Sequence, residues 1–340
     1  MSLDVRGAAG AAGAVDLGPL SGLAADPTVT DVLVNGDGSV WVERHGALVA
    51  TGRRLGLAEV ELLIERIVTP LGLRVDRSSP VVDARLPDGS RVHAVVPPVA
   101  VDGPCLAVRR FSVRPLPLAA WCGEPVAELL AAAVTAGWNL VVAGGTGAGK
   151  TTLLNALAGC APPAERVVTV EDAAELRLPQ PHVVRLEARP SNAEGVGEVA
   201  LRDLVRSALR LRPDRLVVGE VRGGEALDLL QALNTGHVGC LATVHANGPA
   251  DALRRIETLV LLAGVGLPLG AVRAQLAAAV DAVVHVARGA NGARRVTAVA
   301  EVGAATADAD SLPVRLLADG ERILAGPRRG ARRPAPVSAA

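Results

Sequence analysis

The sequence predicts a protein of the α/β class with two domains: a smaller α+β domain at the amino terminus, then a domain with a mostly parallel sheet. Three observations support this prediction. The chain has 340 residues, more than a single hydrophobic core usually organises. Its first third shows short strands joined by hairpin turns. The rest alternates helical segments with short, continuously apolar strands, which is typical of parallel sheets covered by helices.

The amino-terminal domain is expected over residues 15–112. Within it, apolar residues recur at helical spacing over residues 57–71, so this segment should be a helix. Glycine and alanine dominate residues 1–14, which we expect to be disordered. The strands are expected on either side of two hairpin turns, at residues 29–34, 40–43, 81–86 and 91–96.

A connector is expected at residues 113–119, because two prolines close together resist both a helix and a strand ladder. The second domain should cover residues 120–305. Its predicted strands are residues 140–143, 167–170, 183–186, 216–218, 241–244, 283–286 and 296–299. A C-terminal segment, residues 306–340, follows. Its Pro-, Arg- and Ala-rich tail from residue 326 has no apolar periodicity, and we expect it to be disordered.

Charge and composition exclude several classes of protein. Lys plus Arg equals Asp plus Glu at 35 each, so the chain has no net field to hold nucleic acid. With three Trp, one Phe and no Tyr it also has few side chains on which bases could stack, and we expect no stable nucleic acid partner. The four cysteines form no Cys-x-x-Cys pair, which argues against a zinc ribbon or a disulfide framework and favours a reducing compartment.

The sequence also predicts where the protein works. The amino terminus lacks the basic start and the continuous apolar stretch of an export signal. The longest uncharged stretch, residues 129–149, could span a bilayer by length alone, but four glycines crowd its end. It is better interpreted as a helix, a strand and a glycine loop. We therefore expect a cytoplasmic protein whose contact with the membrane is peripheral.

The glycine loop carries the most informative motif. Residues 144–151, Gly-Gly-Thr-Gly-Ala-Gly-Lys-Thr, fit the pattern G-x-x-x-x-G-K-[ST] between a predicted strand and a predicted helix. Glycines let successive N–H groups point inward around phosphates, and the following helix directs its positive end at them. Lys150, the sole lysine of the chain, should contact the β and γ phosphates, and the Thr151 hydroxyl should bind Mg²⁺.

A nucleoside triphosphate with Mg²⁺ is the ligand that this motif predicts. The alternative is a glycine-rich turn with a surface lysine, although a chance match to the motif is on the order of one in a thousand for this composition. The residues expected to hold the phosphates are Gly145, Thr146, Gly147, Ala148, Gly149, Lys150, Thr151 and Thr152.

Three side chains that follow predicted strands are candidates for the hydrolytic chemistry, because the carboxyl ends of parallel strands meet at one edge of a sheet. Glu220 could hold the metal through water or polarise the attacking water. Glu171 is a second acid, and His245 could bond the γ phosphate. Each has a plainer alternative: a surface acid, a solvated loop residue, and a hydrogen-bonded histidine at a strand end.

The chain resembles the secretion traffic ATPases of type II and type IV systems over residues 18–302. Residues 80–112 resemble the amino-terminal domain of the tight-adherence (Tad/Flp) pilus branch and of its relatives associated with conjugal transfer. The tetracysteine zinc module of the type II secretion branch has no counterpart in the sequence. The segments that match the family's Walker A, Asp box, Walker B and His box are GGTGAGKTTLLNAL (144–157), TVEDAAEL (169–176), LRPDRLVVGEVRGGEALDLLQALNTGH (211–237) and ATVHAN (242–247).

The resemblance implies a RecA-like P-loop NTPase domain that hydrolyses ATP within a homohexamer on the cytoplasmic face of the membrane. It also implies that Arg109 and Arg110, near the domain junction, reach the phosphates; a basic strand edge before a linker is the alternative. The expected function is a motor that couples ATP turnover to movement of an inner-membrane platform, for pilus assembly, secretion or conjugal transfer. A nucleic-acid motor and a nucleotide-binding regulator without turnover are the alternatives.

Overall fold

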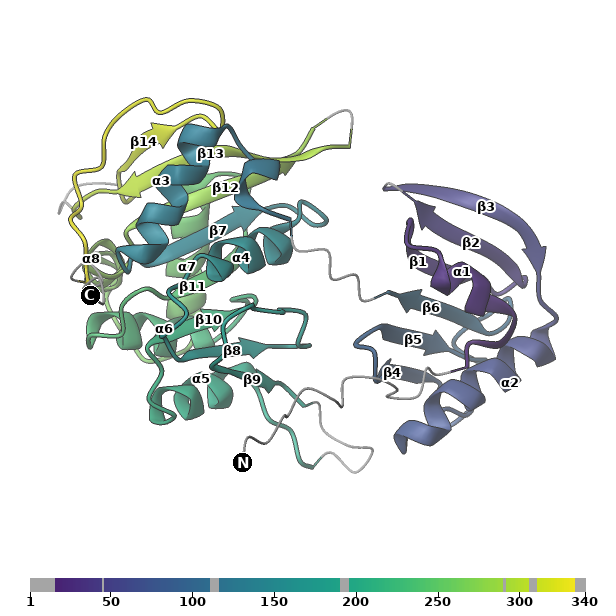
Figure 1. Ribbon diagram of the computed structural model, residues 1–340. Coiled ribbons are helices and arrows are strands. Elements are labelled where there is room, and N and C mark those ends of the chain that lie inside the picture. The colour runs from purple at the N-terminus through teal and green to yellow at the C-terminus, as the bar shows by residue number, and fades with distance from the viewer. Residues whose placement is uncertain are drawn as a thin grey trace, which may run out of the picture. The chain divides into compact units, whose positions relative to one another are not determined.

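The computed structural model describes residues 16–44, 46–110, 116–189, 196–289, 292–305 and 311–333. The chain forms two compact units, Met1–Arg114 and Pro115–Ala340 (Figure 1). Their boundary falls within the predicted connector, residues 113–119. The segment 1–14, for which the sequence predicts disorder, lies outside the described residues.

The amino-terminal unit contains a six-stranded antiparallel sheet with the strand order β3-β2-β1-β6-β5-β4. Its strands are β1 (Val29–Val34), β2 (Ser39–Arg44), β3 (Ala47–Arg54), β4 (Val81–Arg85), β5 (Arg91–Val95) and β6 (Cys105–Arg109). Its helices are α1 (Ser21–Ala25) and α2 (Leu57–Val68), with short 3-10 turns η1 (Gly18–Leu20) and η2 (Thr69–Leu71). The sequence analysis predicts four of these strands and α2, but neither β3 nor β6.

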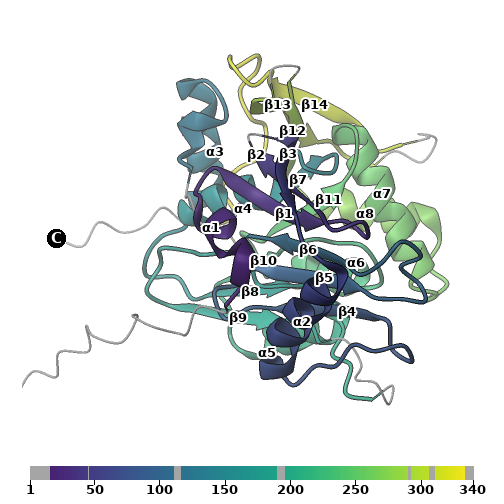
Figure 2. The same cartoon turned by 90° about the vertical axis from the view of Figure 1, so that its right-hand side faces the viewer.

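Helix α2 covers one face of this sheet, as the two directions of view in Figure 1 and Figure 2 show. Alternate residues of β1, such as Val32 and Val34, point into the core under the helix. They belong to one buried cluster with Val60, Ile64 and Ile67, which follow each other at helical spacing on α2. The apolar residues that alternate on the strand and those that recur at helical spacing on α2 therefore pack into a single apolar core.

The second unit contains an eight-stranded sheet with the order β14-β13-β12-β7-β11-β10-β8-β9. The six strands from β12 to β9 are parallel, and β13 and β14 are antiparallel, which confirms the predicted mostly parallel sheet. The strands are β7 (Leu140–Gly144), β8 (Val167–Glu171), β9 (Val183–Glu187), β10 (Arg215–Val218), β11 (Leu241–His245), β12 (Ala282–Arg288), β13 (Arg294–Val302) and β14 (Val314–Ala318). The helices are η3 (Leu118–Ala120), α3 (Glu124–Thr135), α4 (Lys150–Gly159), α5 (Leu201–Arg210), α6 (Glu225–Asn234), α7 (Pro249–Leu262) and α8 (Leu269–Ala279).

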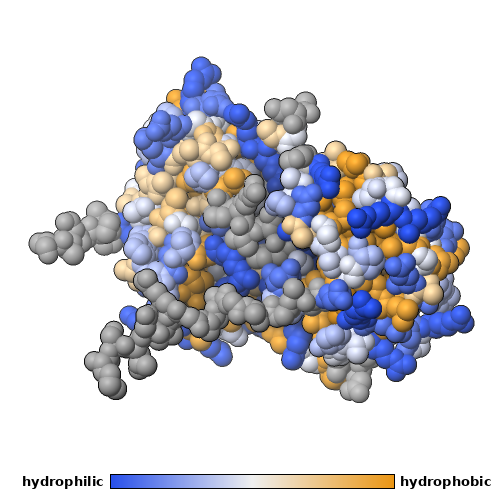
Figure 3. Space-filling view, turned by 45° about the vertical axis from the view of Figure 1, so that its right-hand side comes forward, coloured by the Kyte–Doolittle hydropathy of each residue, from blue (hydrophilic) through white to orange (hydrophobic). Residues whose placement is uncertain are grey.

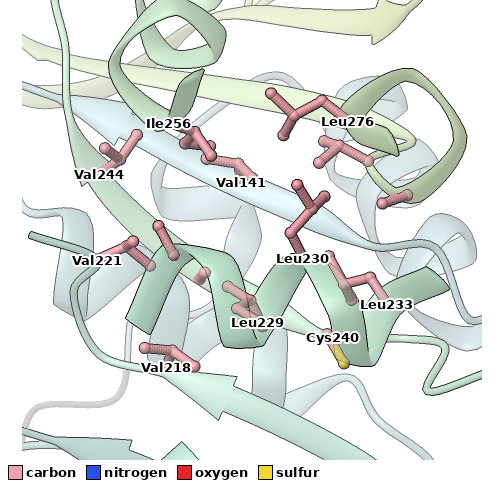
Figure 4. Packing of buried hydrophobic residues seen from close by; sticks show 14 of the residues in the cluster. Val141, Val218, Val221, Leu229, Leu230, Leu233, Cys240, Val244, Ile256 and Leu276 are labelled. Atoms are coloured by element: carbon pink, nitrogen blue, oxygen red, sulfur yellow. The ribbon is translucent and has the colours of Figure 1, made fainter. Parts of the chain in front are cut away.

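Helices cover both faces of this sheet, and β7 shows why its sequence is apolar throughout. Leu140 and Val142 belong to the cluster of α3 and α4, whereas Val141 belongs to the cluster of α5, α6, α7 and α8. In the second cluster Val141, Leu230 and Leu276 point toward one another from β7, α6 and α8 (Figure 4). A strand that is covered on both faces needs apolar side chains on both.

The C-terminal strap, residues 326–333, is bonded to the second sheet at the edge where β7 and β12 begin. Asp281, which directly precedes β12 and is 1% exposed, accepts hydrogen bonds from Arg332 Nε at 2.6 Å and Arg329 Nη1 at 3.3 Å. Glu301, also buried, accepts two backbone N–H groups of the strap at 2.7 and 2.8 Å. The strap thus supplies hydrogen-bond donors to two buried carboxylates, which also accept from the Asn139 N–H and from Arg315, respectively.

The strap also closes over the start of β7 and the loop before β11. The indole N–H of Trp138 donates to the carbonyl of Gly330 at 3.1 Å. Arg333 forms an ion pair with Glu165 and donates to the Val238 carbonyl at 2.8 Å. The strap therefore connects segments that are far apart in the sequence.

The expectation of disorder from residue 326 does not hold for the strap. Polar contacts with distant buried acids hold the strap in place. Contacts of this kind need no apolar periodicity, so a prediction of order from apolar periodicity misses the strap. Residues 334–340 lie outside the part of the chain that the structure describes.

Candidate nucleotide site

The glycine-rich motif forms the turn between β7, which ends at Gly144, and α4, which begins at Lys150. Gly147 and Gly149 have φ values of 70° and 96°, which residues with a side chain rarely adopt. The turn leads into the first turn of α4, whose backbone N–H groups have no partner within the helix. The predicted phosphate-binding residues lie in this loop or in that first turn: Gly145, Thr146, Gly147, Ala148, Gly149, Lys150, Thr151 and Thr152.

The two ends of the loop differ in how tightly they are packed. Gly149 lies against the ring of Trp121, which is 1% exposed. A Cβ atom at Gly149 would lie 2.8 Å from that ring and 2.9 Å from the side chain of Arg294. At Gly145 a Cβ atom would have no neighbour within 4 Å. Of these two positions, only Gly149 is therefore closed to a side chain by its surroundings.

We expect Gly149→Ala to lower the free energy of unfolding by at least about 1 kcal/mol, since the positive φ and the contact with Trp121 both oppose a methyl group. Gly145→Ala is the matched control in the same loop, and it should change this free energy by less than about 0.5 kcal/mol. Urea unfolding of the two variants beside the wild type measures both effects. Equal losses in the two variants would contradict the steric account.

Lys150 bends back over the loop. It is 8% exposed, and its Nζ donates to the Gly145 carbonyl at 3.0 Å. The same Nζ lies 3.3 Å from Nε2 and 3.4 Å from Nδ1 of His245. Burial lowers the pKa of Lys150 below its usual value, and the negative charge of Glu220 opposes this shift. The ammonium group is thus held at the centre of the loop, where the motif requires it.

His245 and Glu220 extend this contact along the carboxyl edge of the sheet. His245 is the last residue of β11 and Glu220 follows the neighbouring strand β10, and His245 Nε2 lies 2.7 Å from Glu220 Oε1. The pKa of His245 is lowered by burial and then by the Lys150 ammonium, while Glu220 acts in the opposite direction. The structure therefore brings together three of the predicted site residues, which come from the start of α4, the end of β11 and the segment after β10.

Glu171 does not join this contact. It is 2% exposed, and its Oε1 accepts the backbone N–H groups of Glu175 and Leu176, both at 2.9 Å. Its side chain packs against the backbone of Gly219, where a Cβ atom would lie 2.9 Å from Glu171 Cγ. Burial raises the pKa of Glu171. The side chain is turned into the interior, and its catalytic role stays a prediction.

The residue next to it, Asp172, contacts Arg222. Its Oδ2 lies 2.8 Å from Nη2 of Arg222, and the same nitrogen lies 2.9 Å from Glu220 Oε2. The sequence analysis does not single out Arg222 or assign a role to Asp172 alone. The available signal was position: Asp172 lies two residues and Arg222 four residues beyond the end of a predicted strand.

Arg109 and Arg110 lie at the end of β6 in the amino-terminal unit. Arg109 is exposed and stands opposite Arg91 of β5 and Asp31 of β1 in the ladder. Arg110 donates to the carbonyl of Val29 at 2.8 Å and to that of Asp26. Arg110 is thus bonded to its own unit through backbone carbonyls. The role of both arginines toward phosphate stays a prediction.

Comparison with known proteins identifies the family. A model of the family described as "Type II/IV secretion system protein" matches residues 13–312. The chain belongs to this family. It is a P-loop ATPase of the type II/IV secretion group. Its glycine loop and its mostly parallel sheet agree with this membership.

Two curated relatives of this secretion ATPase carry names from conjugation. It is 49% identical over 300 residues to the "Putative conjugal transfer protein Rv3659c" of Mycobacterium tuberculosis, a match that covers 85% of this chain and 84% of the relative. It is 36% identical over 286 residues to the "Conjugal transfer protein TrbB" of Rhizobium radiobacter, covering 82% of this chain and 84% of the relative.

A solved structure shares the fold. The ATPase DotB of Legionella pneumophila is similar with a TM-score of 0.61 over 82% of this chain and 78% of that chain, at 22% sequence identity. At this identity the similarity shows that the two proteins have the same architecture.

Proposed function

We propose that this chain is the ATP-driven motor of a conjugal-transfer or related type IV secretion system. The observation that carries the proposal is the contact among Lys150, His245 and Glu220 at the carboxyl edge of the sheet. Phosphoryl transfer needs a cation on the phosphates and a group that orients water, placed close together. The similarity to two conjugal transfer proteins supports the cellular setting.

The residues of the loop fit ATP with Mg²⁺. The backbone N–H groups at the start of α4 would bind phosphate oxygens, and Lys150 would exchange the Gly145 carbonyl for one of them. Thr151 and Glu220 offer a hydroxyl and a carboxylate, the hard oxygen donors that suit Mg²⁺. Mg²⁺ takes few protein ligands when phosphates complete its shell, and it would neutralise negative charge on them.

Glu220 is the group that we assign to the attacking water. Its side chain is 19% exposed, and its buried Oε1 atom faces His245. The lowered pKa of His245 favours the neutral ring near pH 7, which can donate one N–H to the γ phosphate. Loss of that phosphate would remove this hydrogen bond. The loss would act on the loop that leads into α7, because His245 directly precedes that loop.

Arg109 and Arg110 are proposed to add positive charge to the phosphates from the amino-terminal unit. Arg109 is exposed and carries a forked donor group suited to phosphate oxygens. Arg110 would first have to leave the carbonyl of Val29. We therefore assign the larger share of this role to Arg109. Glu171, whose carboxylate is buried, is proposed to support the site only through the backbone next to Glu220.

We further propose that the motor is a homohexamer on the cytoplasmic face of the membrane and acts on an inner-membrane platform protein. In the parts of the chain that the structure describes, no helix combines the length and the apolar character of a membrane span. We propose no stable nucleic acid partner, since acidic and basic residues balance at 35 each. The face shown in Figure 3 mixes hydrophilic and hydrophobic residues on both units.

ATP turnover should rise when membranes that contain the platform protein are added, because a motor is coupled to the load that it moves. The assay compares the purified protein alone, with vesicles carrying the platform protein, with empty vesicles, and with single-stranded DNA. We expect stimulation of ATP turnover only in the sample with vesicles that carry the platform protein. Stimulation by DNA alone would favour a nucleic-acid motor, and no turnover in any sample would favour a regulator that binds nucleotide without hydrolysis.

Pilus assembly of the tight-adherence type is a second candidate. The resemblance of residues 80–112 to the amino-terminal domain of that branch favours it. Neighbouring genes distinguish the two candidates: pilin and platform genes beside this one would support the pilus, and genes for conjugal transfer would support the first proposal.

A further inference from the structure

Arg222 bridges two carboxylates that follow neighbouring strands of the sheet. Its Nη2 lies 2.9 Å from Glu220 Oε2, and its Nε donates to the same oxygen at 3.1 Å. The same Nη2 lies 2.8 Å from Oδ2 of Asp172. Glu220 follows β10 and Asp172 follows β8, and these two strands are adjacent and parallel. One guanidinium thus connects the ends of two strands.

The backbone that carries Arg222 is itself fixed. The Oε1 atom of Glu225 accepts the N–H groups of Arg222 at 2.6 Å and of Gly223 at 2.8 Å. Glu225 is 5% exposed and is the first residue of α6. The Arg222 side chain therefore starts from an anchored turn, and Asp172 lies at ion-pair distance from the same Nη2 that contacts Glu220.

Side chains lie close to both oxygens of Glu220. His245 contacts Oε1 at 2.7 Å, and Arg222 contacts Oε2. The contact from Arg222 Nε is a hydrogen bond, whereas His245 lies at ion-pair distance from Oε1 without hydrogen-bond geometry. A charged hydrogen bond of a guanidinium has a defined direction, so Arg222 is the group that restricts rotation of this carboxylate. Groups that orient a reacting carboxylate or metal ligand typically contribute a factor of about 10 to 100 in activity.

We propose that Arg222, supported by Asp172, is a positioning residue that holds the Glu220 carboxylate in its working orientation. The proposal rests on the role proposed above for Glu220 in hydrolysis. Arg222 has a side chain that is 56% exposed, and exposed ion pairs contribute little to folding stability. Its removal should therefore affect turnover much more than unfolding.

The test compares steady-state ATP hydrolysis of variants at Arg222 and Asp172 with that of the wild type. Arg222→Ala should lower kcat about 10-fold and leave KM for ATP within about 2-fold. Arg222→Lys keeps a charge but replaces Nε and Nη2, which both contact Glu220 Oε2, by a single ammonium group, so its kcat should lie between those of Arg222→Ala and the wild type. Asp172→Ala should lower kcat less than Arg222→Ala does.

The double variant gives the sharpest result. If Asp172 acts through Arg222, then Arg222→Ala combined with Asp172→Ala should have the kcat of Arg222→Ala alone. The matched control is Arg295→Ala, which removes another exposed arginine with a 2.6 Å ion pair, to Glu321, and it should keep wild-type kcat. Thermal unfolding of every variant identifies any loss of folding.

Three results would overturn the proposal: an unchanged kcat in Arg222→Ala, a raised KM with unchanged kcat, or a double variant in which the two losses multiply. A wild type that does not hydrolyse ATP would instead refute the proposed ATPase role. A crystal structure of Arg222→Ala then decides the positioning itself. We expect the Glu220 carboxylate to adopt a new rotamer there, and a carboxylate that stays unmoved against His245 would overturn the proposal.

Discussion

Lys150→Ala is expected to lower ATP turnover by at least about 100-fold, the usual cost of removing a group that stabilises charge in a closed site. The Nζ atom lies among the Gly145 carbonyl, His245 and the start of α4, and no other lysine exists in the chain to replace it. Turnover with ATP and Mg²⁺ measures the loss. Unfolding of the variant should start no earlier than in the wild type, because burial disfavours this ammonium group.

Lys150→Arg provides the control for charge. It keeps the positive charge, but a planar guanidinium does not fit an ammonium site that is 8% exposed, so turnover should fall nearly as far. Turnover in Lys150→Ala above about a tenth of the wild-type value would be inconsistent with the assigned role. Full activity in Lys150→Arg would show that any nearby positive charge is sufficient.

Deleting the strap by ending the chain at Ala325 should have the second large effect. The deletion removes both arginine partners of the buried Asp281, which then keeps only the Asn139 N–H. It also removes two backbone N–H donors of the buried Glu301, which keeps its ion pair with Arg315. A buried charge that loses its partners typically destabilises a protein by about 3–5 kcal/mol. We therefore expect the free energy of unfolding of the second unit to fall by at least about 3 kcal/mol, measured by urea unfolding.

Two further variants test whether the buried charge of Asp281 causes the loss of stability. A chain that ends at Arg333 keeps all the strap contacts described above and should retain wild-type stability. Asp281→Asn in the chain that ends at Ala325 removes the unpaired charge and should recover part of the loss. If the chain ending at Ala325 unfolds like the wild type, the strap contributes no net stability.

The second sheet was largely predictable because its signal is local. Every predicted strand of that domain is present, since a strand buried on both faces needs apolar residues throughout, as β7 shows. Strand β3 shows the opposite case. Seven of its eight residues are exposed, so it has no alternation between apolar and polar positions to detect.

The sequence predicts that the site lies at the ends of particular strands, but it does not predict which side chains there face one another. Glu171 and Asp172 are neighbours in the sequence, and a reader of the sequence cannot know which carboxylate faces the edge of the sheet. Successive side chains of an extended segment point in different directions. The structure turns Glu171 inward onto the N–H groups of the following loop and directs Asp172 to Arg222. That choice depends on tertiary contacts.

The strap was unpredictable for a related reason. Its partners, Asp281 and Glu301, precede it by dozens of residues, and no short pattern connects them. A composition rich in Pro, Arg and Ala is typical of disordered tails, because it offers no apolar surface to bury. Here arginines compensate buried acids instead.

The contact between Trp121 and Gly149 gives the protein an intrinsic optical reporter. The chain has three tryptophans and no tyrosine: Trp41 lies on β2, Trp138 is bonded to the strap, and Trp121 touches the end of the phosphate loop. With Trp41 and Trp138 replaced by phenylalanine, ultraviolet emission would come from Trp121 alone. Nucleotide capture and release could then be followed in real time without attaching a dye.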